Sequence, residues 1–568
     1  MHYFPLSPAL LRPRLTWKGG APQNLDYGDI YGSRAGAMAE TEYVFLAGNG
    51  FPARWQAEHI TIAELGFGTG LNFLIAWKQF LNHAPSHARF QFLSVEQAPM
   101  TAEEILRAAA PYPELSTLAA ALAARLPQRI AGIHALQFGR VHLTLGYGEA
   151  ASILPHFHTA VDAWFLDGFS PAKNSDIWRE AVLAHIARLG GTVATYTAAS
   201  VVRKRLEALG LTVEKRPGFA GKRDMLVASP SSTRTAKRAS GRIAVIGGGI
   251  AGCASARALA ERGFTVTLHE RQTIATGASG NPAALLYPRL TKHWSEAMSF
   301  YLHAYSYLLS HLSEWGVTHG SPGLIKTSHS RQEEERFFDF NTRTGIDAEI
   351  LHPVNRKQAS DILGMAAPAG GIYFPRGTWL DPRDFCTKLL THPDITVKEY
   401  HPIERLGDIS EPCVVLCNAE DAARLAPEHA LKIGRSAGQI SHIPPAQIKQ
   451  TPRCLYSHQG YALAVAGELF IGATYDHTDF SGDVTITNHQ QNYAHTSTAL
   501  PDLLGTPDFT LWQGRTSLRA TTPSRMPYLG KLAPGLYINA GHGSRGMLSA
   551  PYGASLLAED IAIAATTG

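Results

Sequence analysis

The chain has 568 residues, enough for three or four folding units at about 150 residues each. A hydrophobic content of 45% and a charged content of 17% are typical of a globular protein with a large core. No uncharged apolar run is long enough to span a bilayer, which argues against a membrane protein. The formal net charge of +4 permits an anionic partner without requiring one.

The cysteines, the histidines and the first residues of the chain indicate the compartment and the kind of site to expect. The five cysteines form no CxxC pair, so we expect a protein of a reducing compartment. The 25 histidines show no metal-binding spacing, and no metal site is predicted. The segment Met1–Leu6 lacks the basic and apolar regions of a signal peptide. We therefore expect a cytoplasmic location.

Residues 60–230 alternate strand-like apolar runs with helix-like segments. Helical patterns lie between the runs, for example at Met100–Ala110 and Ser175–Arg188. This alternation predicts a Rossmann-like α/β domain, with a parallel sheet that binds its ligands at the carboxyl ends of the strands. The candidate strands are Ile60–Leu65, Phe90–Val95, Val141–Leu145, Ala163–Leu166 and Gly191–Thr195.

A glycine-rich loop follows the first strand. Gly66, Gly68 and Gly70 allow the backbone to turn sharply and approach a ligand closely. Glu64, at the strand end, is placed to bind the ammonium group of an aminoacyl sulfonium. We therefore predict an S-adenosylmethionine site at this loop.

Two further acids support this prediction. Glu96 ends the second strand, where a carboxylate can accept hydrogen bonds from both ribose hydroxyls; the alternative is a solvated charge at a strand end. Glu149 follows the third strand, where an acid that contacts adenine is expected.

The run Asp162–Trp178 is the most specific stretch of this half. Its apolar strand ends in Asp167-Gly-Phe169, followed by a loop that contains proline. Asp167 is predicted to orient an acceptor amine, and Phe169 to stack on a base. The competing interpretation is that Asp167 caps a turn and Phe169 belongs to the core.

A polar, basic segment divides the chain. Residues Ser229–Gly241 show no apolar periodicity and are predicted to be a linker. We assign a domain with the S-adenosylmethionine site, and thus a candidate methyltransferase, to residues 1–230, the linker proper to 231–241, and a second domain to 242–568. The last part is long enough for a cofactor domain with an inserted α+β substrate domain.

A second glycine-rich loop opens that part. Gly247, Gly249 and Gly252 lie between the strand-like Arg242–Ile246 and a helical run, and the next strand ends in Glu270. The complete pattern within about 30 residues predicts a dinucleotide whose pyrophosphate lies at the helix N-terminus and whose ribose binds Glu270. This motif alone is also compatible with NAD.

Two later segments favour FAD. A small polar loop contains Ser279, Gly280 and Asn281 soon after the acidic strand. A strand, a turn with Gly541, Gly543 and Gly546, and a helix follow near the C-terminus. This second strand and helix are expected to place backbone N–H groups at the flavin edge.

Three arginines flank these segments, namely Arg515, Arg519 and Arg545. An arginine fork binds a carboxylate through two hydrogen bonds. We predict that Arg519 or Arg545 binds a substrate carboxylate, with Arg545 preferred because its turn is expected beside the flavin. For each arginine, a structural or surface charge is the alternative.

Together these motifs resemble the family of bifunctional tRNA 5-methylaminomethyl-2-thiouridine biosynthesis proteins over nearly the whole chain. The stretches that carry the resemblance include Glu64–Phe73, Asp162–Trp178, residues 222–226, Gly247–Gly252 and residues 541–551. The oxidoreductase half is in turn similar to glycine oxidase and D-amino acid oxidase. Two departures are Glu149, where aspartate is expected, and Pro282 beside the flavin loop.

The resemblance implies a substrate that needs both cofactors. It implies tRNA with a carboxymethylaminomethyl group on the wobble uridine. FAD-dependent oxidation would remove the carboxymethyl group, and S-adenosylmethionine would then methylate the amine. A monomer or weak oligomer is expected, with no membrane partner. Basic residues near the junction are candidates for phosphate contacts. They are Arg203, Lys204, Arg205, Lys215, Arg216, Lys222, Arg223, Arg234, Lys237, Arg238 and Arg242.

Two other functions fit the residues less well. One is a small-molecule amine oxidase fused to an N-methyltransferase, without an RNA substrate. The other is a tRNA-binding protein whose methyltransferase half serves only for recognition. The acid and glycine set of the first loop argues against the second.

Overall fold

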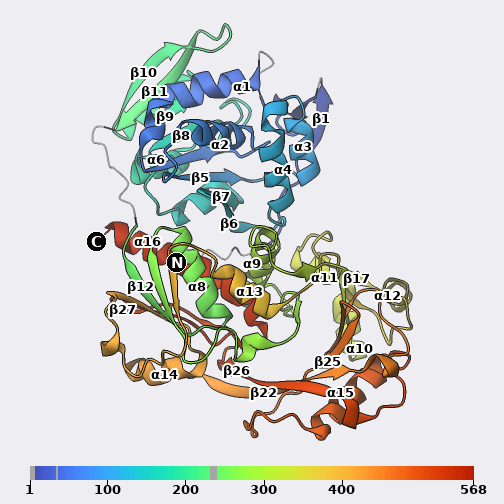
Figure 1. Ribbon diagram of the computed structural model, residues 1–568. Helices are drawn as coiled ribbons and strands as arrows, with labels where there is room; N and C mark the ends of the chain where they lie inside the picture. The colour runs from blue at the N-terminus through green and yellow to red at the C-terminus, as the bar shows by residue number, and fades with distance from the viewer. Residues whose placement is uncertain (1–4, 6, 19, 33–35, 231–238, 568) are drawn as a thin grey trace. The chain divides into compact units, whose positions relative to one another are not determined.

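The described chain forms two units, each built around its own largely parallel sheet (Figure 1). The computed structural model describes residues 5, 7–18, 20–32, 36–230 and 239–567, without the side chain of Thr567. The first unit consists mainly of Met1–Arg238 and the second mainly of residues 239–565. Most of the predicted linker, including Arg234, Lys237 and Arg238, lies outside the described residues.

The first unit contains an eight-stranded sheet in the order β10-β11-β9-β8-β4-β5-β7-β6. Its five central strands are parallel, and antiparallel strands flank them on both sides. The strands are β4 (His59–Leu65), β5 (Arg89–Glu96), β6 (Gly132–Phe138), β7 (Val141–Tyr147), β8 (Ala163–Leu166), β9 (Thr192–Thr195), β10 (Leu211–Pro217) and β11 (Asp224–Pro230). All five predicted strands are confirmed, with ends that differ by two residues or fewer. Ser229 and Pro230, predicted to start the linker, instead pair with β10.

Two apolar cores cover the two faces of this sheet. On one face, α2 (Leu71–His83) contributes Phe73 and Phe80, which pack near Phe90 and Phe92. On the other face the helices are α6 (Glu180–Leu189) and α7 (Ser200–Ala208). The predicted helix at Ser175–Arg188 starts later than expected, because Asp176–Trp178 forms a 3₁₀ turn.

The N-terminal residues and further helices complete the unit. A three-stranded sheet of β1 (Leu15–Lys18), β2 (Ala21–Asn24) and β3 (Asp29–Ile30) precedes α1 (Ala37–Glu40) and a π-helix, η1 (Thr41–Leu46). The remaining helices are α3 (Ala102–Ala109), α4 (Ser116–Arg125) and α5 (Ala150–Ile153).

The second unit begins with a six-stranded sheet in the order β20-β13-β12-β21-β28-β27, in which only β27 is antiparallel. The predicted βαβ motif is confirmed, with α8 between β12 and β13. The elements are β12 (Arg242–Ile246), α8 (Ile250–Glu261), β13 (Thr265–His269), β20 (Ile395–Lys398), β21 (Cys413–Leu416), β27 (Tyr528–Ala533), β28 (Leu536–Ala540) and α16 (Gly546–Thr567).

Strands inserted between these form a mainly antiparallel eight-stranded sheet in the order β17-β18-β16-β23-β24-β25-β22-β26. They are β16 (Leu324–Thr327), β17 (His352–Val354), β18 (Gly371–Phe374), β22 (Gly434–Ile443), β23 (Leu455–Ser457), β24 (Tyr461–Val465), β25 (Glu468–Gly472) and β26 (Gln513–Thr521). A small sheet comprises β14 (Ala284–Leu286), β19 (Thr378–Leu380) and β15 (His319–Gly320). The longer helices of this region are α9 (Glu296–His311), α10 (Arg331–Phe338), α12 (Arg356–Leu363), α13 (Pro382–Leu389) and α15 (Ile486–Ala499). The predicted inserted α+β region is thereby confirmed.

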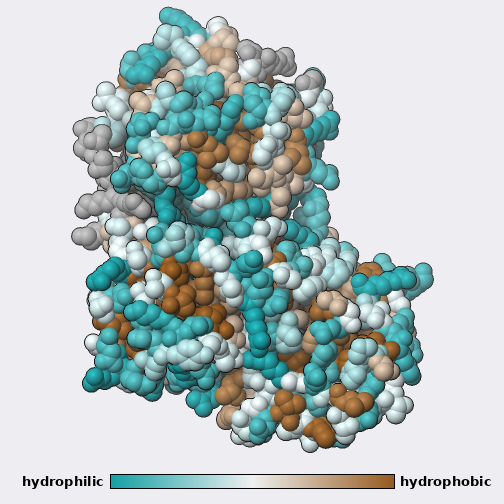
Figure 2. Space-filling model, viewed as in Figure 1, coloured by the Kyte–Doolittle hydropathy of each residue, from teal (hydrophilic) through white to brown (hydrophobic). Residues whose placement is uncertain are grey.

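The surface mixes polar and apolar residues. On the face seen in Figure 2, hydrophobic patches are interspersed with hydrophilic residues in each unit. Among the described residues, no helix is both long and apolar enough to cross a membrane.

Candidate functional sites

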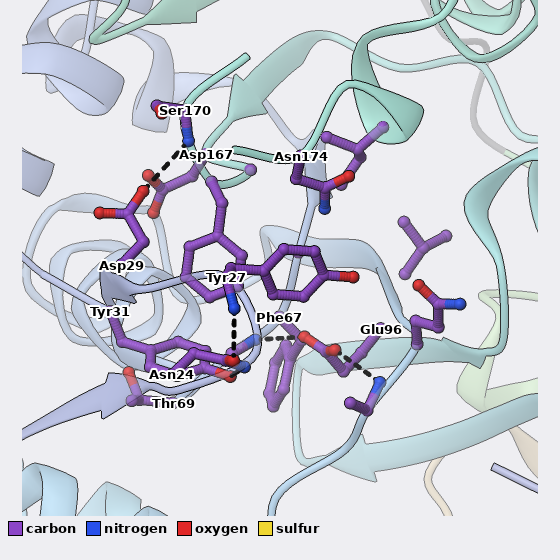
Figure 3. A pocket seen from close by; sticks show the side chains of 18 of the residues that line it. Asn24, Tyr27, Asp29, Tyr31, Phe67, Thr69, Glu96, Asp167, Ser170 and Asn174 are labelled. Carbon is purple, nitrogen blue, oxygen red and sulfur yellow. Dashed lines mark hydrogen bonds between the residues drawn. The ribbon is translucent and has the colours of Figure 1, made fainter. Parts of the chain in front are cut away.

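The first unit has a cavity of about 730 Å³ where strand order reverses. The strands β5 and β8 lie on opposite sides of β4, so the loops after β4 and β8 diverge at their carboxyl ends. Residues that follow each of these strands line the cavity, as does the N-terminal segment with Tyr27 and Tyr31 (Figure 3).

The glycine loop after β4 forms one wall. Gly66 and Gly68 line the cavity, whereas Gly70 precedes α2 without lining it. All three have positive φ angles. A Cβ atom on Gly68 would lie 2.9 Å from Cδ1 of Tyr31, so the site requires a residue without a side chain there.

The two predicted nucleoside-binding acids both line this cavity. Glu96 accepts hydrogen bonds from the backbone N–H groups of Gly68 and Ala98, each at 2.8 Å (Figure 3). Burial raises the pKa of Glu96, and these backbone donors oppose the rise. Glu149 is half exposed and lies 3.9 Å from Arg179.

Glu64 does not line the cavity, in contrast to its predicted role beside the ligand. Its side chain is 1% exposed and accepts hydrogen bonds from Asn72 Nδ2 and Ser94 Oγ, each at 2.8 Å. Burial, with a contribution from Asp167, raises the pKa of Glu64 well above its usual value. Because β4 is central in the sheet and covered on both faces, the side chains of Ile60–Leu65, Glu64 included, are buried.

Asp167 lies at the carboxyl end of β8 and lines the cavity. Its Oδ2 accepts a hydrogen bond of 2.6 Å from Asn72 Nδ2. Burial raises the pKa of Asp167 to about 7, although the Asn72 bond and the charge of Lys222 lower it. At neutral pH this carboxyl group therefore exchanges readily between its two protonation states.

The cavity also contains polar residues that the sequence analysis did not assign to it. Lys222 pairs with Glu40 at 2.7 Å and lies over the ring of Tyr196 at 4.6 Å. The Tyr196 hydroxyl donates to the Gly168 carbonyl at 2.9 Å. Asn72 lies in the first turn of α2 and is the one polar residue of the apolar stretch Leu71–Trp77, which is a signal that the sequence contains. The sequence predicts Lys222 as a phosphate contact, whereas the structure places it in this cavity.

Phe169 lies in an aromatic cluster. Its ring centroid is 5.0 Å from that of Tyr27 and 5.1 Å from that of Tyr31, the latter edge to face. Phe169 lines the cavity together with both tyrosines. The cluster provides apolar ring surface of the kind on which a base stacks.

The second unit has its own cavity of about 580 Å³ at the carboxyl ends of β12, β13 and β21. Gly247 and Gly249 line it, and Gly252 lies behind them in α8. A Cβ atom on Gly252 would lie 1.7 Å from the Gly247 carbonyl oxygen, so only glycine lets the helix approach the strand this closely. Glu270 accepts from Gly248 N at 2.6 Å and from Gln272 N at 2.8 Å.

The polar loop after β13 lies on the same cavity. Ser279 and Asn281 line it, whereas Gly280 does not. The Ser279 hydroxyl accepts from Ile250 N at 2.9 Å, at the start of α8. Arg515 donates to Asn281 Oδ1 at 2.7 Å and to two carbonyls of the loop, and so ties the loop to β26.

The C-terminal turn completes the wall with Gly541, Gly543 and Gly546. Between them, His542 is hydrogen-bonded to Ser549 Oγ and Asn539 Oδ1, each at 2.8 Å. Burial lowers the pKa of His542 to about 3, so this imidazole is neutral at physiological pH.

Both predicted carboxylate-binding arginines line the second cavity. Arg519 is 7% exposed, donates to the Thr474 carbonyl at 3.2 Å and packs over Tyr475 at 4.5 Å. Arg545 donates to the Tyr287 carbonyl at 3.0 Å and packs over the Tyr287 ring at 4.7 Å. Each fork retains N–H groups beyond these bonds.

Several of the predicted phosphate contacts form ion pairs at the surface of the first unit. Pairs join Arg203 with Glu207 at 2.8 Å and Arg216 with Glu214 at 3.0 Å. Arg223 is 96% exposed in its side chain. Exposed pairs of this kind contribute little stability and exchange readily for phosphate partners. In the part of the chain that the structure describes, no group of three metal-binding side chains is found.

Comparison with known proteins matches a family to each of the two units. A model of FAD-dependent oxidoreductases matches residues 242–560, and a model of S-adenosyl-L-methionine-dependent methyltransferases matches residues 113–231. The tRNA 5-methylaminomethyl-2-thiouridine biosynthesis bifunctional protein MnmC of Pseudomonas aeruginosa (strain UCBPP-PA14) is 35% identical, over 96% of this chain and 94% of its own. The chain belongs to this family.

A second relative is similar over nearly its whole length. MnmC of Methylobacillus flagellatus is 34% identical over 97% of this chain and 93% of its own. Among solved structures, glycine oxidase from Geobacillus kaustophilus covers 57% of this chain and 95% of its own, with 21% identity and a TM-score of 0.49.

The residues present fit both cofactors of the family. At the second cavity, Gly252 lets α8 pack closely against the Gly247 backbone. The N-terminus of α8 then lies at the cavity, where it can bind a pyrophosphate. Asn418 lines the same cavity, and its buried Oδ1 has no hydrogen-bond partner among the described residues. In the first cavity, the open backbone at Gly66 and Gly68 faces the acids that a nucleoside requires.

Proposed function

We propose that this chain modifies the wobble uridine of tRNA in two steps. The oxidoreductase unit removes the carboxymethyl group from 5-carboxymethylaminomethyl-(2-thio)uridine and leaves a primary amine. The methyltransferase unit then methylates that amine with S-adenosylmethionine. The single observation that carries the proposal is the position of Asp167 and Phe169 in one cavity with the Gly66–Gly68 loop.

The methyl transfer needs a neutral amine. A free alkylamine has a pKa near that of lysine, about 10.4, and is mostly protonated at neutral pH. Asp167, whose pKa is about 7, accepts the proton and orients the nitrogen toward the sulfonium methyl group. Ionised Asp167 by itself would favour the ammonium form, and the positive charge of Lys222, which lines the same cavity, opposes this. The aromatic cluster around Phe169 holds the base.

The oxidative step is assigned to the second cavity. Glycines 247, 249 and 252 and Glu270 would hold the dinucleotide, with Ser279, Asn281 and the turn at Gly541–Gly546 nearer the flavin. When bound, FAD supplies a two-electron acceptor that is reoxidised by an external acceptor such as dioxygen. Arg545 or Arg519 binds the substrate carboxylate. Water then adds to the oxidised carbon, the carbon–nitrogen bond breaks, and the carboxymethyl group leaves as glyoxylate.

The setting of the reaction is part of the proposal. We assign the protein to the cytoplasm, where tRNA is found, as a monomer or weak oligomer that needs no metal. Arg203, Arg216 and Arg223 are proposed to contact tRNA phosphates. The domain division at residues 230 and 242 is proposed as the functional boundary.

The test is mass analysis of tRNA nucleosides after incubation with the purified protein. Substrate tRNA should yield the aminomethyl nucleoside without S-adenosylmethionine and the methylaminomethyl nucleoside with it. A protein that leaves tRNA unchanged but oxidises small amines would contradict the proposal and favour the small-molecule alternative. Binding of tRNA that weakens as salt rises would support the phosphate contacts.

A further inference from the structure

We propose that Asn72 is a positioning residue of the methyl-transfer site: its amide group orients Asp167, stabilises the ionised carboxylate and links it to buried Glu64. This inference rests on the proposed methyl transfer and deepens it. The geometry is specific, because Asn72 Nδ2 donates to Asp167 Oδ2 at 2.6 Å and to Glu64 Oε1 at 2.8 Å. One amide group therefore serves two carboxyl groups from two neighbouring strands, β8 and β4.

A third residue fixes which way the amide faces. Thr41 Oγ1 lies 2.6 Å from Asn72 Oδ1 and 3.1 Å from the Ala37 carbonyl oxygen, and it donates its single hydrogen to the nearer Asn72 oxygen. A hydroxyl donor on the oxygen leaves the Asn72 nitrogen to face the carboxyl groups. Thr41 opens the π-helix η1, and such helices occur often at functional sites. Thr41 and Asn72 both line the cavity.

The charged groups around Asp167 make this donor important. Glu64 faces it from β4, Glu40 from α1, and Lys222 from the loop before β11. Tyr196, after β9, faces both Asp167 and Asp29. Glu96, the last residue of β5, contributes to raising the pKa of Glu64.

Burial and Glu40 raise the pKa of Asp167, while Asn72 and Lys222 lower it. Lys222 is already paired with Glu40. Asn72 is therefore the direct hydrogen-bond donor that keeps the proton-accepting form of Asp167 available near neutral pH.

Three variants of the full chain test the inference: Asn72→Ala, Thr41→Val and, as a matched conservative control, Thr41→Ser. The substrate is tRNA that already carries the primary aminomethyl group, and kcat/KM for methylation is measured against pH. Loss of the Asn72 donor should move the acidic limb of the profile to higher pH. At pH 7 kcat/KM should fall by about 10- to 100-fold, the effect of one hydrogen bond to a charged group.

Thr41→Val should shift the limb in the same direction by less, and Thr41→Ser should keep the wild-type profile. The oxidative step of the same molecules should be unchanged, since that cavity lies in the other unit. The inference is overturned if Asn72→Ala lowers kcat/KM equally at every pH. If Asn72→Ala fails to fold, Thr41→Val decides the question. An acidic limb of its kcat/KM profile at the same pH as in the wild type then overturns the inference. Wild-type protein that fails to methylate this tRNA would instead refute the proposed function.

Discussion

At the scale of single residues, the ionisation of Asp167 should govern methylation. Its pKa is about 7 in the folded protein, and only the ionised form can accept the proton of the substrate amine. We predict that kcat/KM for methylation falls about tenfold per pH unit below pH 7. Stopped-time assays on tRNA with the primary amine would measure this. A flat profile between pH 5.5 and 8 would assign the proton to another group.

Asp167 should also lower the stability of the folded protein at alkaline pH. The pKa of Asp167 is higher in the folded state than its ordinary value of 3.8, so the folded state binds more protons between these values. Stability contributed by the protonated form is therefore lost as pH rises through 7. We predict that Asp167→Asn raises the melting temperature of the full chain at pH 8 and has little effect at pH 4. The upper bound on the gain at pH 8 is about 4 kcal/mol, at 1.36 kcal/mol per pKa unit. Calorimetry showing equal or opposite differences at the two pH values would contradict this.

The two arginines of the second cavity allow a charge-conserving test. Lysine keeps the charge of Arg545 or Arg519 but loses the planar fork. We predict that the residue that binds the substrate carboxylate loses about 10- to 150-fold in kcat/KM for removal of the carboxymethyl group when replaced by lysine. Methylation of tRNA with the primary amine should be unchanged, because that substrate has no carboxylate. If both Arg545→Lys and Arg519→Lys remove the carboxymethyl group at the wild-type rate, neither arginine binds the substrate carboxylate through its fork.

At the scale of elements, the N-terminus of α8 should decide FAD binding. Any side chain at position 252 would overlap the Gly247 carbonyl and push the helix away from β12. We predict that Gly252→Ala purifies without FAD, as judged from its visible absorption spectrum. Gly407→Ala is the matched control, because a Cβ atom there meets nothing within 4 Å. Yellow Gly252→Ala protein with wild-type FAD content would show that the helix can shift.

Strands and loops could be predicted where a short stretch of sequence carries the pattern. Strands β4, β5, β7, β8 and β9 follow from apolar runs in the sequence, and the loop at Gly247–Gly252 follows from its glycines after such a run, whereas β6 was not predicted. Asn72 and Tyr196 could not be assigned in this way, because the crossing of chain segments, not sequence spacing, brings them to Asp167. Glu64 lies near the end of β4 as predicted, but its side chain is hydrogen-bonded to Asn72 and Ser94 and does not line the cavity, so its contact with a ligand stays a prediction.

At the scale of the whole molecule, each cavity is lined entirely by residues of its own unit. The two reactions should therefore not require one and the same protein molecule. The tRNA can be released after the oxidative step and bound by a second protein molecule for methylation. We predict that a mixture of Asp167→Ala and Gly252→Ala proteins converts carboxymethylaminomethyl tRNA to the methylated product, although neither variant does so alone. The first variant supplies the primary amine and the second methylates it.

Nucleoside mass analysis over time would follow the three species in this mixture. The aminomethyl form should rise and then decline, faster when more Gly252→Ala protein is added. Gly252→Ala must first be shown to methylate tRNA that already carries the primary amine. If it does so and the mixture still stops at the primary amine, transfer between the two sites requires both within one chain.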